Sequence, residues 1–208
     1  MIKLEKELLN EIDWRTNELS IIRTIPLLCN CTNDQIRIIE KYSVVAIYSI
    51  WEGFVVTSFN IYIRELNNLN LTYDKLNLNI LTHDIDIKFD ITNERNDFNS
   101  KSALVNNLHG YFSFPINITT KIPTESNVNY KVITKLLKHY NLEQLPEQIF
   151  KKSFDKLLTV RNHIAHGDNN IPVDKKMIQE FNFTVIEAMH EVTNNIINGF
   201  INKTYLKK

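Results

Sequence analysis

The sequence predicts a mainly helical bundle, interrupted once by a small β-hairpin or sheet between its second and third main helices. Two observations predict the helices: apolar residues recur every three or four positions over most of the chain, and capping signals flank several of these runs. The third observation is a change of period near residues 83–91, where apolar residues alternate with polar ones. Since 43% of the 208 residues are apolar, we expect one domain over residues 1–208.

The first two helices are predicted from apolar spacing and from one cap. Helical intervals run from about residue 4 to residue 25, where Pro26 is expected to end the helix. The second helix begins after Thr32, which forms a capping-box pattern with Gln35, and continues to about Leu66. Its apolar stripe is rich in aromatic residues, as expected for a central helix: Ile36, Ile39, Val44, Tyr48, Trp51, Val55, Phe59 and Tyr62.

Residues 70–125 are interpreted as a polar insertion with a hairpin or small sheet. Residues 83–91 place their isoleucines and Phe89 on one face, which indicates a half-exposed strand. Residues 110–118 resemble a second strand at an edge, because Pro115 cannot donate to a ladder.

Three further helices are predicted after the insertion. Helical spacing returns at residues 132–137, and Pro146 suits the first position of the next helix. A last helix is expected from about Asp174 to Leu206. The helix after Pro146 carries the apolar positions Ile149, Phe150, Phe154, Leu157, Leu158, Ile164 and Ala165.

Composition limits the classes of function. The 24 basic and 24 acidic residues give a formal net charge of zero, whereas dedicated non-specific nucleic-acid binders are usually basic. RNA binding would therefore need a local patch or a groove formed by oligomerisation. No histidine pair supports a metal site, and the sequence, with only four glycines, contains no Gly-rich phosphate-binding loop, so neither metal nor cofactor is expected.

A cytoplasmic location is expected, without contact to a membrane. The charged start Met1-Ile2-Lys3-Leu4-Glu5 is not a signal peptide, and no stretch approaches about 18 uncharged apolar residues. Cys29 and Cys31 are interpreted as free thiols, because they are too close in sequence for an ordinary disulfide framework.

The run Arg161-Asn162-His163-Ile164-Ala165-His166-Gly167 carries chemistry suited to a phosphodiester. The planar guanidinium of arginine can bind two phosphate oxygens, and the imidazole of histidine exchanges protons near neutral pH. Arg161 follows Phe154 by seven residues, so it lies on the same apolar stripe and needs a partner or a ligand. An ion pair with Glu52 or Glu187 is the structural alternative.

The spacing of the motif poses a geometric problem. His166 lies five residues after Arg161, which on a regular helix is roughly 140° around the axis. Either the helix ends there or the site is shared between two chains. Gly167 is a stop signal, so His166 is expected at the helix C-terminus, where the dipole favours imidazolium. Asn162 and His163 would add hydrogen-bond donors near the phosphate.

Together with two other segments, this run resembles the HEPN superfamily. The Arg–polar–x–x–x–His pattern with Asn162 is similar to that of HEPN ribonucleases. The segment Trp51-Glu52-Gly53-Phe54 resembles the aromatic helix of stand-alone HEPN proteins from bacterial defence and toxin systems. More weakly, residues 129–137 are similar to the helix before the catalytic one. Asp168 stands where toxins paired with a nucleotidyltransferase antitoxin often have tyrosine, so that form of regulation is doubtful.

The resemblance implies a HEPN-like helical bundle that forms a homodimer, with the active site at the dimer cleft. It implies metal-independent cleavage of RNA through the 2′-hydroxyl, leaving a 2′,3′-cyclic phosphate and a 5′-hydroxyl. Arg161 would stabilise charge on the phosphate, His166 would transfer protons, and Asn162 would orient the groups. His163 and Glu52 are accessory candidates. The biological role would be that of a toxin or antiviral effector, and its partner an antitoxin or a defence complex.

Two interpretations compete with the nuclease. A non-catalytic HEPN module that binds RNA or a partner protein is favoured slightly by the neutral net charge. A helical dimerisation subunit would use Arg161 only to bridge an interface. The presence of Arg161, Asn162 and His166 together favours the enzyme. For Trp51, a place in the core is favoured over stacking on a base.

Overall fold

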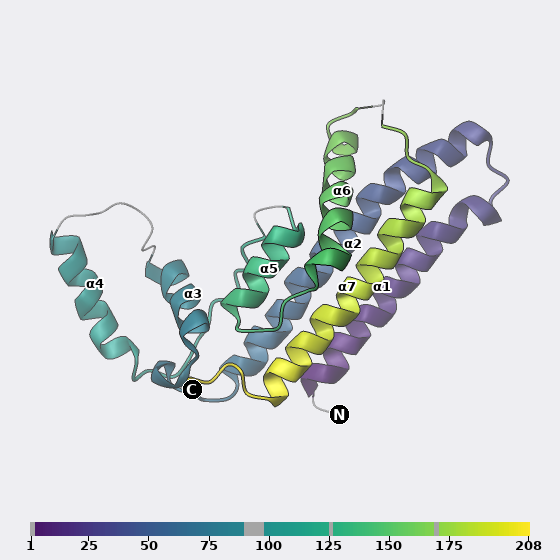
Figure 1. The fold of residues 1–208 in the computed structure, drawn as a ribbon. Coiled ribbons are helices and arrows are strands. Elements are labelled where there is room, and N and C mark those ends of the chain that lie inside the picture. Colours follow the sequence, from purple (N-terminus) through teal and green to yellow (C-terminus); the bar gives the residue numbers. More distant parts are fainter. Residues whose placement is uncertain (1–2, 90–97, 125–126, 169–170) are drawn as a thin grey trace.

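The computed structural model describes residues 3–89, 98–124, 127–168 and 171–208, and the chain in these ranges is mainly helical (Figure 1). The helices are α1 (Lys3–Leu28), α2 (Asn33–Asn67), the 3₁₀ turn η1 (Tyr73–Lys75), α3 (Leu78–Phe89), α4 (Phe98–Tyr111), α5 (Tyr130–His139), α6 (Glu147–Ala165) and α7 (Lys175–Ile201). The described residues contain isolated β-bridges but no strand.

The long helices α1, α2, α6 and α7 pack side by side, and α2 contacts the other three (Figure 1). Because α2 has neighbours on several sides, it buries residues around much of its circumference rather than along one stripe. By length and composition alone α2 could also cross a membrane, and it is the one helix of the described ranges that could. Its most apolar window is 56% buried in the bundle, as in the core helix of a soluble protein.

Several predicted helix ends are confirmed, while others shift by a few residues. The Thr32 side chain accepts from Gln35 N–H and the Gln35 side chain accepts from Thr32 N–H, which completes the predicted capping box. α1 continues past Pro26 to Leu28, because a proline in the last turn leaves little helix behind it to disrupt. Pro146 is the N-cap of α6 rather than its first residue. α7 begins after Asp174 as predicted but ends at Ile201, five residues before Leu206.

The predicted hairpin within residues 70–125 is wrong in its first strand, because residues 83–89 belong to α3. The buried Asp84 carboxylate accepts from Lys88 Nζ at 2.8 Å, one helical turn on, and from Tyr111 Oη at 2.7 Å. The backbone N–H of Thr119 donates to it at 3.0 Å. A helix brings Asp84 and Lys88 together, whereas a strand would separate them along its length. Residues 90 and 91 of the predicted strand lie outside the described ranges.

The second predicted strand also takes a different form. α4 extends to Tyr111, and the following extended residues hydrogen-bond to residues 71–74 instead of to the first predicted strand. The bonds run from Tyr73 N to Phe114 O, from Asp74 N to Phe112 O and from Ile116 N to Leu71 O, beside one isolated bridge at Pro115. The insertion is thus two helices with an extended return segment, and α4 stands apart from the bundle (Figure 1).

Two histidine rings pack against each other at a tilt where α3 meets α5. The ring centroids of His83 and His139 are 4.4 Å apart, and Tyr140 packs against His83 from the side. Burial lowers the pKa of His83 to about 4, and the charges of His139 and Lys135 add to this, while Asp84 and Asp86 oppose it. Burial also lowers the pKa of His139. Both imidazoles are therefore neutral at neutral pH.

This pair makes stability depend on pH. The pKa of His83 is about 6.5 when unfolded and about 4 when folded, so the unfolded chain binds the proton first. The free energy of unfolding should fall by roughly 3 kcal/mol as the pH drops from neutral through that interval. Urea unfolding across this range measures it. His83→Gln should flatten the dependence, whereas His190→Gln, on the exposed side of α7, should not. Equal slopes for wild type and His83→Gln would contradict this origin.

Candidate active site

Helix α6 ends within the motif, as the sequence predicts. Gly167 adopts φ +84°, the left-handed region that glycine tolerates best. Gly167 N–H donates to Ile164 O at 3.1 Å, and Asp168 N–H donates to His163 O at 2.9 Å. These two bonds form a Schellman motif with His166 at the C-cap. The chain therefore leaves the helix axis directly after His166.

The Arg161 guanidinium lies over an aromatic ring of the central helix. Its Cζ is 4.7 Å from the ring centroid of Tyr48, a cation–π arrangement. Nη1 donates to Oδ1 of Asn162 at 2.9 Å, while Nε is buried without a partner. Among the described residues no carboxylate pairs with this cation, so the ion pairs weighed with Glu52 and Glu187 are not formed. The positive charge remains available to an anion.

Tyr48 is a site residue that sequence reasoning treated only as core. Its Oη accepts from Val128 N–H at 2.6 Å, which fixes the ring beneath Arg161. Burial and the Glu52 carboxylate raise the pKa of Tyr48 to about 12, against the opposing effects of the Val128 hydrogen bond and the Arg161 charge. The phenol is therefore neutral at physiological pH. The available signal was spacing: Tyr48 and Glu52 are four residues apart and share a face of α2.

Glu52 is half-buried and close enough to Tyr48 to affect its pKa. None of the hydrogen bonds or ion pairs found in the described ranges involves this carboxylate. Glu52 thus lies near the Tyr48 ring, on which Arg161 packs, but it forms no ion pair with Arg161. The sequence-based assignment of Glu52 as an accessory residue is consistent with this placement and stays a prediction.

The two histidines of the motif occupy different environments. His163 is exposed, and its Nδ1 lies 3.2 Å from Oδ2 of Asp168, across the end of the helix. His166 is also exposed, and its ring has no hydrogen bond to any other described residue. The exposed His166 ring is therefore accessible to a substrate, and imidazole is the side chain most often used in general acid–base chemistry.

Arg161 and His166 do not share a face of α6. The helix is regular through Ala165, so the five-residue spacing keeps them roughly 140° apart. Of the apolar positions predicted on this helix, Phe150, Phe154, Leu157 and Ile164 are buried, whereas Ile149 and Ala165 are exposed. One chain therefore presents the guanidinium against α2 and the imidazole toward solvent.

In the segment Trp51-Glu52-Gly53-Phe54, the two aromatic residues are explained by packing in the core. Trp51 is fully buried, donates from Nε1 to Val128 O at 2.9 Å and stacks on Phe154 at 4.6 Å between centroids. Its place in the core is confirmed. Gly53 faces Arg15, and a Cβ at position 53 would lie 3.6 Å from Arg15 Nη2, an ordinary van der Waals distance. The buried Arg15 also pairs with Glu11 and lies over Phe54.

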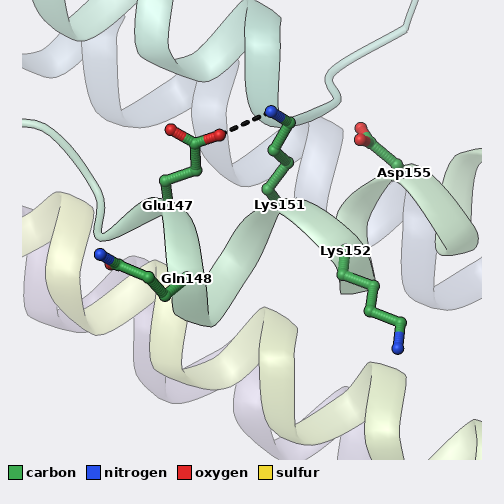
Figure 2. Close-up of a pocket in the computed structure, with 5 residues that line it drawn as sticks. All are labelled: Glu147, Gln148, Lys151, Lys152 and Asp155. Atoms are coloured by element: carbon green, nitrogen blue, oxygen red, sulfur yellow. Dashed lines mark hydrogen bonds and ion pairs between the residues drawn. The ribbon is translucent and has the colours of Figure 1, made fainter.

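A shallow hollow on the first turns of α6 is distant from this chemistry. Figure 2 shows its lining of Glu147, Gln148, Lys151, Lys152 and Asp155, all side chains of one exposed helix face. Lys151 Nζ lies 2.6 Å from Glu147 Oε1, so one of its two lysines is already paired. The hollow lies more than a turn before Arg161 along the helix and adds nothing to the motif. In the described ranges, no group of three His, Cys, Asp or Glu residues could hold a metal ion.

The helices α1, α2, α6 and α7 form a bundle, and the Arg161–His166 segment lies at the end of α6. A family model described as HEPN_MAE_28990-like HEPN matches residues 4–205, nearly the whole chain, and the protein belongs to this family. No curated protein and no solved structure matches the chain.

Proposed function

We propose that this protein is a metal-independent endoribonuclease whose catalytic residues are Arg161, His166 and Asn162. The observation that carries the proposal is the Arg161 cation, held 4.7 Å above the Tyr48 ring without an ion pair to any carboxylate in the part of the chain that the structure describes. Partial burial of a cation without a counter-ion destabilises the fold unless a ligand pairs with the cation. A phosphate supplies the opposite charge. Membership of the HEPN family, in which ribonucleases are frequent, supports the same conclusion.

The reaction uses the 2′-hydroxyl of RNA as its nucleophile. An imidazole accepts the hydroxyl proton while the 2′-oxygen bonds to phosphorus and the bond from phosphorus to the 5′-oxygen breaks. An imidazolium gives its proton to that leaving oxygen. The products are a 2′,3′-cyclic phosphate and a 5′-hydroxyl. Arg161 stabilises the charge on the non-bridging oxygens, and Asn162, which accepts from Nη1, holds the guanidinium in place.

The complete site is formed by two copies of the chain. Within one chain, Arg161 faces α2 and His166 faces solvent, so they do not converge on one phosphate. In a two-fold dimer the same surface of each copy faces the other, and His166 of one copy can approach Arg161 of its partner. His163 and Glu52 are accessory groups at the edge of the shared site.

The test is RNA cleavage by the purified protein in EDTA. We expect fragments with 2′,3′-cyclic phosphate and 5′-hydroxyl ends, and no cleavage of a strand carrying 2′-deoxyribose at the cut site, because the nucleophile is then absent. Mass spectrometry of the fragments identifies their ends. If RNA stays intact with and without metal but is bound, the alternative of a non-catalytic HEPN module that binds RNA or a partner replaces the nuclease.

In the cell, the proposed role is that of a cytoplasmic toxin or antiviral effector. Expression of the wild type should arrest growth, and expression of His166→Ala to the same level should not. Restraint would come from an antitoxin or from a defence complex. Asp168 does not offer the tyrosine hydroxyl that nucleotide transfer would modify, so a binding partner suits this chain better.

A further inference from the structure

A groove lies at the end of the bundle where the motif is found. Its walls are the first turns of α2 and residues 171–173, which follow the motif and lead into α7; its volume is about 730 Å³. Figure 1 shows that the end of α6, the start of α7 and the start of α2 lie at the same end of the bundle. The groove is lined by Asp34, Arg37, Ile38, Lys41, Tyr42, Ile171, Pro172 and Val173.

The groove combines cations with an exposed aromatic ring. Tyr42 is 58% exposed, although a large aromatic side chain gains from burial, and Lys41 lies 5.9 Å from its ring centroid. Arg37 is 81% exposed and 3.9 Å from Asp34, a surface pair that contributes little stability. Stacking rings beside cations is the way proteins bind single-stranded RNA without requiring a sequence.

The groove is aligned with the proposed site. Lys41 precedes Tyr48 by seven residues, which places it on nearly the same face of α2, about 10 Å along the axis. A strand whose phosphate lies at Arg161 above Tyr48 can therefore follow α2 toward Lys41 and Tyr42. The chain has no net charge, so a local patch of this kind is what RNA binding by it requires.

We propose that this groove binds the single-stranded RNA flanking the cleaved phosphate, with Tyr42 stacked on a base and with Arg37 and Lys41 on phosphates. The inference rests on the proposed function, because it takes RNA as the ligand. Asp34 repels phosphate and is the unfavourable residue of the groove. Replacing Asp34 should therefore raise the affinity for RNA, whereas replacing the other three residues should lower it.

The experiment measures binding of a fluorescent 2′-O-methyl oligonucleotide of roughly 12 nucleotides, within the usual range of single-strand sites, by anisotropy. Such RNA binds but lacks the nucleophile. Tyr42→Ala should weaken binding about tenfold. Arg37→Ala with Lys41→Ala should weaken it and lower the salt slope by about 1.4, or 0.7 for each phosphate. Asp34→Asn should strengthen it a few-fold. The matched control, Lys151→Ala with Lys152→Ala on α6, should change nothing.

Two outcomes would contradict the proposal that the groove binds RNA. One is unchanged affinity in the Tyr42 and Arg37/Lys41 variants, with their helical circular dichroism intact. The other is a change from dimer to monomer in Tyr42→Ala at unchanged RNA affinity, which would make this face a contact between copies. Failure of the nuclease is separate: if the wild type cuts no RNA but these variants still weaken binding, the groove stands and the catalytic proposal falls.

Discussion

Replacing His166 by alanine is expected to lower the rate of RNA cleavage by about 10²–10⁴-fold, the usual contribution of a general acid or base. Arg161→Ala should lower it by about 10²–10³-fold, because the growing charge on the phosphate loses its cation. Initial rates on one RNA in EDTA measure both effects. Neither side chain is fully buried, so both variants should fold, as circular dichroism can verify.

The matched control for His166→Ala is His190→Ala, which removes an exposed imidazole from α7 and should cut at the wild-type rate. Arg161→Lys should recover only part of the activity, because an ammonium keeps the charge but loses the planar fork. Wild-type rates in His166→Ala would exclude the motif as the active site.

Mixing the two inactive variants tests whether the site is shared. If Arg161 of one copy acts with His166 of the other, an Arg161→Ala/His166→Ala heterodimer has one intact site. Random exchange should then restore about a quarter of the wild-type activity. If each site lies within one chain, the mixture stays inactive. Equal subunit exchange is verified by native mass spectrometry of differently tagged chains.

Trp51→Ala is expected to cost about 3–5 kcal/mol of stability, the usual range for removing a buried tryptophan. The side chain is fully buried, stacks on Phe154 at 4.6 Å and donates to Val128 O at 2.9 Å. The substitution leaves a cavity between α2 and α6 and one unsatisfied carbonyl. Urea unfolding at neutral pH measures the loss.

Trp14→Ala is the control for this prediction. Trp14 is 48% exposed on α1, so its removal should cost about 1 kcal/mol or less. If Trp51→Ala is as stable as the wild type but no longer binds RNA, the prediction is wrong, and the ring acts in RNA binding rather than in the core.

The helices were predictable because their signals are local. The box at Thr32, the stop at Gly167 and the cap at Asp174 each involve residues a few positions apart. The insertion was not predictable in this way. Alternation in residues 83–91 suggests a strand. Asp84 can be buried, however, because Tyr111 and Thr119, roughly thirty residues distant in sequence, donate hydrogen bonds to its carboxylate. Such contacts override a local pattern.

The candidate site could be predicted in part. The sequence indicates Arg161, its place on the stripe and the helix end at His166, all of which follow from spacing. It does not indicate Tyr48, because the contact between the Tyr48 ring and Arg161 forms only when α2 and α6 pack together. Nor does it indicate the groove beside α2, which needs residues 171–173 to fold back against Arg37 and Tyr42.

The position of Val128 has a consequence for mutational robustness. It anchors Tyr48 through its peptide N–H and Trp51 through its peptide C=O, so neither bond depends on the identity of its side chain. Any residue that fits the packing preserves both anchors, and only proline removes the N–H. Substitutions of Tyr48 and Trp51 are therefore expected to disturb the packing beneath Arg161. Position 128, in contrast, should tolerate exchange among apolar residues of similar size.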